Sequence, residues 1–218
     1  DVRGVFYFIF LTSISERIFL ILCNVFVPLV TMRYKEYNPN QVLEKSILLF
    51  WSKGVKGCSI NDIVEDTGVN RFSLYHEFEN KQGILEASLQ LYRTRYAEGK
   101  MKILNEDGDL ATIILSFFMS FLETKKPVAG CYMIHVGTEL ADSDANVKRE
   151  MVNYLSDIEN LFTALLLRNS YTVSHAKFTA KHLLGLFCTA MSFCLIHNKA
   201  EQEIYLLKGI HLILSKHA

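Results

Sequence analysis

Residues 59–81 read SINDIVEDTGVNRFSLYHEFENK, a stretch with the signals of two short helices joined by a tight turn. Ser59 can accept hydrogen bonds from the amides that open a helix, and Asp62, three residues later, completes the spacing of a capping box. Gly68 supplies the left-handed backbone that a tight turn requires. A second short helix is expected over 70–76. This order predicts a helix-turn-helix unit, whose second helix enters a DNA major groove.

Helical signals continue on both sides of this unit. Apolar residues recur at helical spacing over 40–53, with Pro39 where a first turn tolerates it and Gly54 as a stop. Asn80 is a suitable N-cap for a helix over 81–101. The same periodicity predicts helices that carry residues 110–123, 131–140, 145–168, 176–194 and 204–214. The sequence therefore predicts an all-α fold.

Composition limits the class of protein. The chain has 218 residues, of which 50% are hydrophobic, and its 23 Lys and Arg balance 23 Asp and Glu. These values exclude a disordered polymer and a collagen-like repeat, and the neutral balance indicates no particular partner. The five cysteines form no CxxC pair, which argues against a disulfide framework and a zinc knuckle. We expect reduced thiols, a cytoplasmic location, and neither a metal nor a cofactor.

The first 31 residues differ from the rest of the chain. Glu16 and Arg17 interrupt their apolar run, and each would cost about 2.5–3.5 kcal/mol in a bilayer. The uncharged remainder, 18–30, is shorter than the roughly 20 residues a membrane span needs, and no signal-peptide cleavage site follows. We expect residues 1–31 to be an extension outside the native protein, which would start at Met32. The alternative is a short hydrophobic helix that packs on the domain or on a membrane.

The expected helix-turn-helix domain, residues 32–85, is not basic overall. Over 39–85, five Lys or Arg stand against six Asp or Glu, so the distribution of charge has to attract DNA. Lys81 is the clearest signal, because the dipole of the helix that Asn80 caps disfavours a cation there by about 0.3–1 kcal/mol unless an anion is expected nearby. Base-edge contacts are expected from Asn70, Arg71, Phe72 and Ser73. Phosphate contacts are expected from Ser59, Tyr75, His76 and Lys81.

The same segment resembles the TetR family of bacterial transcription regulators. The resemblance is carried by Gly54, Ser59, Ile60, Asp62, Ile63, Gly68, Val69, Leu74, Tyr75, Phe78, Lys81 and Leu85. Cys58, Val64 and Phe72 depart from the usual motif, which leaves the fold intact but makes the DNA sequence unpredictable. The resemblance implies that Tyr75 and Lys81 contact backbone phosphates. For Ser59 the alternative is a cap alone, for Phe72 an exposed apolar residue, and for His76 a solvated side chain.

Residues 86–218 are expected to form a helical ligand-binding and dimerisation domain. The family resemblance implies that a small-molecule inducer enters this domain and releases the DNA by moving the helix that begins at Lys81. Candidates for an apolar chamber are Tyr92, Tyr96, Phe117, Phe121, Tyr132, His135, Tyr154 and Phe162. The alternative is that this aromatic stripe is plain core. For Cys131, a buried small hydrophobe is favoured over a sensor of electrophiles or oxidants.

The last two apolar helices can be buried against their twofold copies, which predicts a homodimer through a four-helix interface. We therefore interpret the chain as a DNA-binding transcriptional regulator, a repressor that a small-molecule inducer releases from a palindromic double-stranded operator. The alternative is a related helical ligand-binding or membrane-tethered protein without specific DNA binding. An enzyme is not expected, because the sequence has neither a Gly-rich phosphate loop nor a nucleophile elbow.

Overall fold

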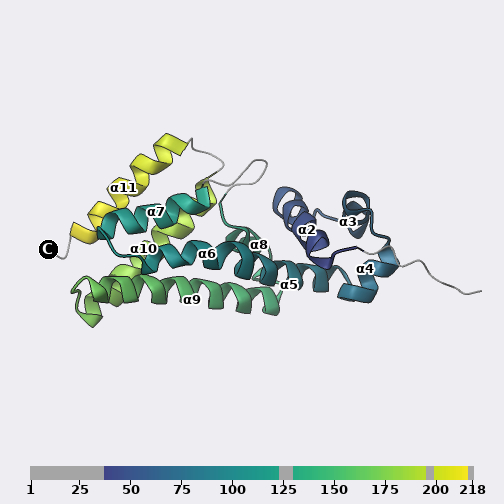
Figure 1. The fold of residues 1–218 in the computed structure, drawn as a ribbon, viewed down its shortest axis with the longest axis horizontal. Helices are drawn as coiled ribbons and strands as arrows, with labels where there is room; N and C mark the ends of the chain where they lie inside the picture. The colour runs from purple at the N-terminus through teal and green to yellow at the C-terminus, as the bar shows by residue number, and fades with distance from the viewer. Residues whose placement is uncertain (1–36, 123–129, 195–198, 216–218) are drawn as a thin grey trace, which may run out of the picture. The chain divides into compact units, whose positions relative to one another are not determined.

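Three short helices begin the described part of the protein. The computed structural model describes residues 37–122, 130–194 and 199–215, so the expectation for residues 1–31 lies outside the described residues. The helices are α2 (Pro39–Lys53), α3 (Ile60–Thr67) and α4 (Arg71–Phe78). Asn38 caps α2 by accepting a hydrogen bond from the backbone of Asn40, and Gly54 ends that helix. These helices form the expected helix-turn-helix unit (Figure 1).

The next helical run differs from the single helix expected over 81–101. It starts as α5 (Lys81–Tyr92), widens into one π-helical turn (Arg93–Ala97), and ends as α6 (Glu98–Met101) followed by a 3-10 turn (Lys102–Asn105). A π turn inserts one extra residue, so the apolar spacing on either side still looks helical. The expected helical run over 81–101 is therefore present, with a π turn inside it that apolar spacing does not show.

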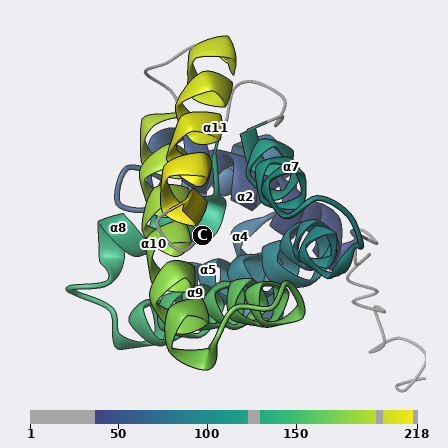
Figure 2. The same ribbon diagram turned by 90° about the vertical axis from the view of Figure 1, so that its left-hand side faces the viewer.

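Five further helices complete the described chain. They are α7 (Leu110–Leu122), α8 (Tyr132–Leu140), α9 (Ala145–Arg168), α10 (Val173–Phe193) and α11 (Lys199–Ser215). α9 packs along α10, and α7 packs along α11 (Figure 1 and Figure 2). The expected all-α fold is confirmed. Of the helices in residues 37–122, 130–194 and 199–215, none combines the length and hydrophobicity needed to cross a bilayer.

Two aromatic clusters mark the core. The first joins α7 to α9 and α10, with ring centroids 5.1–6.0 Å apart, and consists of Phe117, Phe118, Phe121, Phe162 and Phe187. In the second, Trp51 of α2 packs on Tyr92 of α5 and Tyr132 of α8, at centroid distances of 5.8 and 5.7 Å. Aromatic pairs at these distances stabilise a core beyond the area that they bury. The second cluster therefore fixes α2 against α5 and α8.

Candidate nucleic-acid interface

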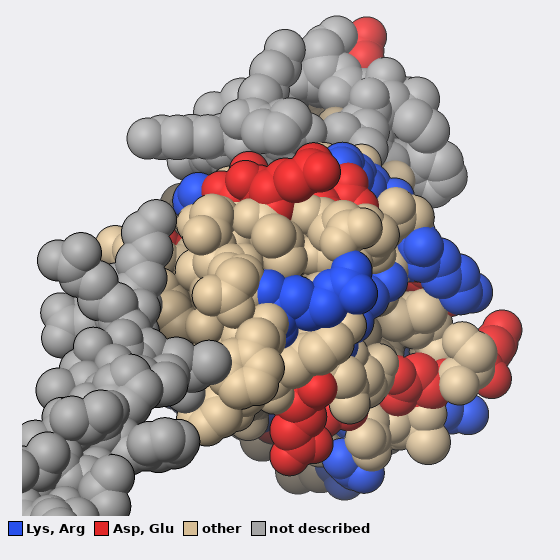
Figure 3. All heavy atoms as spheres, turned by 90° about the vertical axis from the view of Figure 1, so that its right-hand side faces the viewer, with Lys and Arg blue, Asp and Glu red and all other residues tan. Residues whose placement is uncertain are grey.

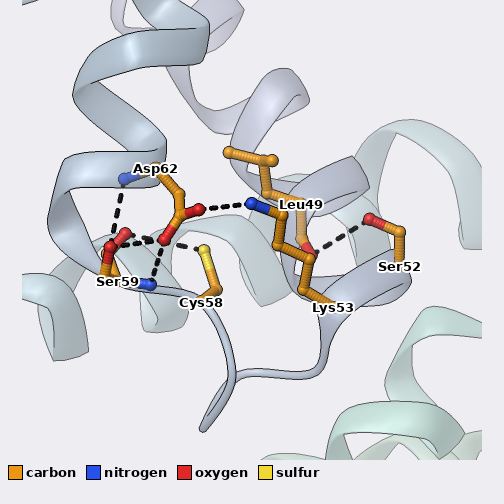
Figure 4. Close-up of polar contacts among 6 residues, drawn as sticks. All are labelled: Leu49, Ser52, Lys53, Cys58, Ser59 and Asp62. Carbon is orange, nitrogen blue, oxygen red and sulfur yellow. Dashed lines mark hydrogen bonds and ion pairs between the residues drawn. The ribbon is translucent and has the colours of Figure 1, made fainter.

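The start of α3 is built as the sequence predicts. The Ser59 hydroxyl accepts the backbone N–H of Asp62 at 3.2 Å, and the Asp62 carboxylate accepts the backbone N–H of Ser59 at 2.7 Å (Figure 4). The Lys53 ammonium, from the end of α2, donates to the same carboxylate. That ammonium, and then the Ser59 donors, hold the pKa of Asp62 well below its ordinary value. The predicted phosphate ligand Ser59 is thus a helix cap beside a carboxylate.

The turn after α3 sets the direction of α4. Gly68 has φ 71 and ψ 9, the left-handed conformation, and its N–H donates to the Val64 carbonyl at 2.9 Å. Asn70 then caps α4, because its side-chain oxygen accepts the Ser73 N–H at 2.9 Å. The expected turn and second helix are present, with α4 ending at Phe78 rather than at residue 76.

Four of the predicted contacts share the outer face of α4. Arg71, Phe72, Tyr75 and His76 are all exposed, whereas Leu74 is fully buried. The Phe72 side chain is 61% exposed, an unusual position for so large an apolar group. The Arg71 guanidinium donates to the side-chain oxygen of Asn61 at 2.6 Å, which holds it at the surface beside α3.

Two other predicted base contacts are placed differently. Ser73 is only 9% exposed, and its backbone carbonyl accepts the hydroxyl of Tyr37 at 2.9 Å. The Asn70 side chain is exposed but already serves as the N-cap of α4. Arg71 and Phe72 therefore present more side-chain surface to a partner than Asn70 and Ser73 do.

Lys81 begins α5, as the sequence predicts. Asn80 caps this helix by accepting the N–H of Gly83 at 3.0 Å. The Lys81 ammonium is half-buried and donates to the Val55 carbonyl, in the loop between α2 and α3, at 2.5 Å. An ammonium has three N–H donors, so this bond leaves capacity for a phosphate. The sequence could not indicate the contact, because it joins residues 26 positions apart.

Acids and bases alternate at this end of the protein. On the face in Figure 3, Lys and Arg lie between groups of Asp and Glu rather than in one unbroken basic patch. Lys45 pairs with Asp66 at 3.7 Å, and Lys53 pairs with Asp62, so cations of α2 offset acids of α3. This agrees with the near-neutral count over 39–85 and leaves three further cations, Lys56 in the loop before α3, Arg71 on α4 and Lys81 at the start of α5.

The predicted ligand-chamber residues divide between the two aromatic clusters. Phe117, Phe121 and Phe162 lie in the first cluster, and Tyr92 and Tyr132 in the second. The Tyr96 side chain is 40% exposed, and its ring stacks on that of Tyr92. His135 is half-buried, and its Nε2 has no hydrogen-bond partner among the described residues. These Phe and Tyr residues thus lie in packed ring groups rather than as isolated side chains.

A buried polar centre lies between α5, α8 and α9. The Cys131 thiol is 3.3 Å from the Tyr154 hydroxyl and accepts the Tyr92 hydroxyl at 3.8 Å. Nearby, the hydroxyls of Ser88 and Tyr132 are 2.8 Å apart. Burial raises the pKa of the Cys131 thiol, so this cysteine is poorly disposed to form a thiolate. This agrees with the reading of Cys131 as a buried small side chain.

Known proteins share both the sequence pattern and the fold. Residues 42–88 match the family model described as bacterial regulatory proteins, tetR family. The HTH-type transcriptional repressor ComR of Escherichia coli (strain K12) is 30% identical over 119 residues, which cover 53% of this chain and 57% of ComR. The uncharacterized HTH-type transcriptional regulator YezE of Bacillus subtilis (strain 168) is 25% identical over 139 residues, or 62% of this chain and 72% of YezE. The chain thus spans little more than half the length of ComR.

Two solved structures show the same fold. SCO4454, a TetR-family transcriptional regulator from Streptomyces coelicolor, aligns with a TM-score of 0.72 and 17% identity, covering 82% of this chain and 94% of that one. A cysteine mutant of the regulator CifR, complexed with 26bp double-strand operator DNA, aligns with a TM-score of 0.72 and 13% identity, covering 81% and 97%.

Proposed function

We propose that this chain, which matches the model of the TetR family of bacterial regulatory proteins over residues 42–88, is a DNA-binding transcriptional regulator of that family. Its role would be that of a cytoplasmic repressor that leaves a palindromic operator when a small molecule binds. Two relatives support this function: one is named a transcriptional repressor, and another of the same fold is bound to operator DNA. These names also favour a regulator over an enzyme.

The observation that carries the proposal is the outer face of α4. Its side chains suit the major groove, since an Arg can pair with guanine and a Phe can contact a thymine methyl group. Arg71 and Phe72 would therefore read bases, with Asn70 and Ser73 beside them. Tyr75 and His76, one turn further along α4, would contact phosphates, with Ser59 and Lys81 at the flanking helix starts.

A homodimer would supply the second copy of α4. Among the side chains described on α10 and α11, the exposed large apolar ones are Val173, Phe178, Ile204, Tyr205 and Leu212. Burying such a surface against its twofold copy would give the four-helix interface expected from the sequence. Two copies of α4, spaced by about one duplex turn of 34–36 Å, would then read an inverted repeat.

The inducer would bind in the second domain. The surroundings of the buried polar centre are apolar with a few polar groups, a combination typical of small-molecule sites. The contacts we propose for the inducer are Tyr92, Tyr96, Phe117, Phe121, Tyr132, His135, Tyr154 and Phe162. The Nε2 of His135 has no hydrogen-bond partner among the described residues, which supports its role as a polar contact.

Selection of bound fragments from a random DNA library by the purified protein tests the proposal. We expect enrichment of an inverted repeat whose half-sites lie about one duplex turn apart. Binding that ignores sequence and disappears with salt would instead favour a helical ligand-binding or membrane-tethered protein without specific DNA binding.

A further inference from the structure

The loop between α2 and α3 is held by a carboxylate that comes from α8. Glu139, the penultimate residue of α8, accepts the backbone N–H of Val55 at Oε2 (2.8 Å) and the backbone N–H of Lys56 at Oε1 (2.7 Å). The Lys56 ammonium donates in return to the Glu139 backbone carbonyl at 3.3 Å. Three hydrogen bonds therefore join α8 to a loop more than 80 positions earlier in the chain.

The same loop is held from its other side by α5. The carbonyl of Val55 accepts the Lys81 ammonium at 2.5 Å, while the N–H of Val55 donates to Glu139. One residue of the loop thus links α8 to α5. Because the loop leads directly into the Ser59 cap, its position fixes where α3 starts, and α4 follows after a short turn.

The hydrogen bonds to Glu139 join backbone N–H donors to a carboxylate. Hydrogen bonds from backbone N–H groups to an ionised carboxylate are shorter and about twice as strong as neutral ones. Val55 is buried, so its N–H would lose its partner if the carboxylate moved away. The loop would then shift toward water or toward another acceptor, and the start of α3 would shift with it.

The opposite end of α8 lies in the buried polar centre. Cys131 is the N-cap residue of α8 and contacts Tyr154, and Tyr132 at its first position contacts Ser88. α8 has nine residues, so roughly 13 Å of rigid helix separates this centre from the loop contact. A displacement of the first turn of α8 would move Glu139 by a similar amount, because a helix of this length moves as one body.

We infer that Glu139 is a positioning residue for DNA binding, through which α8 sets how α3 and α4 are presented to the duplex. The inference rests on the proposed function and adds the route by which a change around Cys131 reaches the DNA-binding helices. A shift or rotation of α8 lengthens both N–H···O bonds, releases the loop and weakens operator binding.

The test compares Glu139→Gln with Asp142→Asn in the full chain. Glutamine retains one acceptor oxygen but places an NH₂ group against a backbone N–H. Asp142 is exposed three positions later, and Asp142→Asn removes the same negative charge without touching the loop contact. Operator affinity is measured as a function of salt, and amide hydrogen exchange is followed at Val55 and Lys56. We expect Glu139→Gln to bind the selected operator at least tenfold more weakly, with faster exchange at both amides. The slope of log affinity against log salt stays at the wild-type value, because no phosphate contact is lost.

Each outcome decides the inference. Wild-type operator affinity in Glu139→Gln despite faster exchange at Val55 and Lys56 overturns the inference while the proposed function stands. An equal loss in Asp142→Asn overturns it too, since charge alone would then explain the effect. If Glu139→Gln does not fold, Glu139→Asp replaces it, because the shorter carboxylate keeps the charge but withdraws from the loop. If the wild-type protein selects no DNA sequence, the proposed function fails, and the inference fails with it.

Discussion

Arg71 is the residue on which we expect base recognition to depend most. It is exposed on α4, and its guanidinium is steadied by Asn61 rather than by an acid. A guanidinium that donates two hydrogen bonds to guanine contributes about 1–3 kcal/mol of discrimination. We expect Arg71→Ala to weaken operator binding by about that amount and to relax selectivity at one base pair. Repeating the DNA selection with this variant checks the prediction, and an unchanged preference at every position would contradict it.

Besides its hydrogen bond to the Val55 carbonyl, Lys81 should contribute to operator binding through phosphate charge. Log affinity falls as log salt rises, and removing one phosphate contact makes this slope shallower by about one while weakening binding to all sequences alike. We therefore expect a shallower slope for Lys81→Ala, measured by titration of operator DNA at several salt concentrations. Lys102→Ala, an exposed lysine change in the 3-10 turn, is the control and should keep the wild-type slope. A wild-type slope in Lys81→Ala would remove Lys81 from the interface.

Gly83 permits α5 to start directly after α4. A Cβ at this position would overlap the backbone carbonyl oxygen of Phe78 and lie 3.0 Å from its carbon. Because backbone atoms have to move, we expect Gly83→Ala to lower the free energy of unfolding by about 3 kcal/mol. Gly99→Ala, at an exposed helical position where an added Cβ meets nothing within 4 Å, should instead raise it by about 0.5–1 kcal/mol. Urea denaturation of both variants distinguishes a packing limit from ordinary helix propensity.

At the scale of one element, α3 depends on an ionised cap. The pKa of Asp62 is lower in the folded protein than in the unfolded chain. Its carboxylate therefore stabilises the fold at pH values above the unfolded-state pKa, and this stabilisation is lost as the pH falls toward the folded-state pKa. We expect Asp62→Asn to be less stable than the wild type at pH 7, with the difference narrowing below about pH 4. Urea denaturation at pH 7 and pH 3 measures this, with Glu65→Gln, which removes an exposed acid of the same helix, as the matched control.

The elements that could be predicted are those with local signals. Ser59, Gly68 and Asn80 mark helix ends through contacts within three or four residues, and the structure has helix boundaries at each of them. The π turn at Arg93–Ala97 leaves the apolar spacing helical, so periodicity could not show it. Its consequence is tertiary, since Arg93 pairs with Asp157 of α9 and Arg95 pairs with Glu44 of α2.

The orientation of α4 was harder to predict than its existence. An eight-residue helix is too short for periodicity to fix which face is buried, and here Ser73 lies inward while Phe72 lies outward. The contact between Glu139 and Val55 was beyond sequence reasoning for another reason. It joins residues 84 positions apart, and only the packing of α8 on α2 and α5 brings them together.

At the scale of the whole molecule, DNA binding should require two chains. Ile204 of α11 is 54% exposed and Val152 of α9 is 55% exposed, so neither supports the monomer core. We expect Ile204→Asp to raise the dimer dissociation constant by about a hundredfold or more, because it buries an unpaired charge, and to abolish binding to the inverted repeat. Val152→Asp should remain dimeric. Sedimentation of both variants tests this, and a dimeric Ile204→Asp would place the interface elsewhere.

Trp51 gives the protein a built-in optical probe. It is the only tryptophan of the chain, and its indole touches rings from α5 and α8. Indole emission responds to the polarity and ring contacts around it, so any compound that alters the packing of these helices should change the intrinsic fluorescence. Chemical libraries can thus be screened on the unlabelled protein, without DNA and before any operator is known.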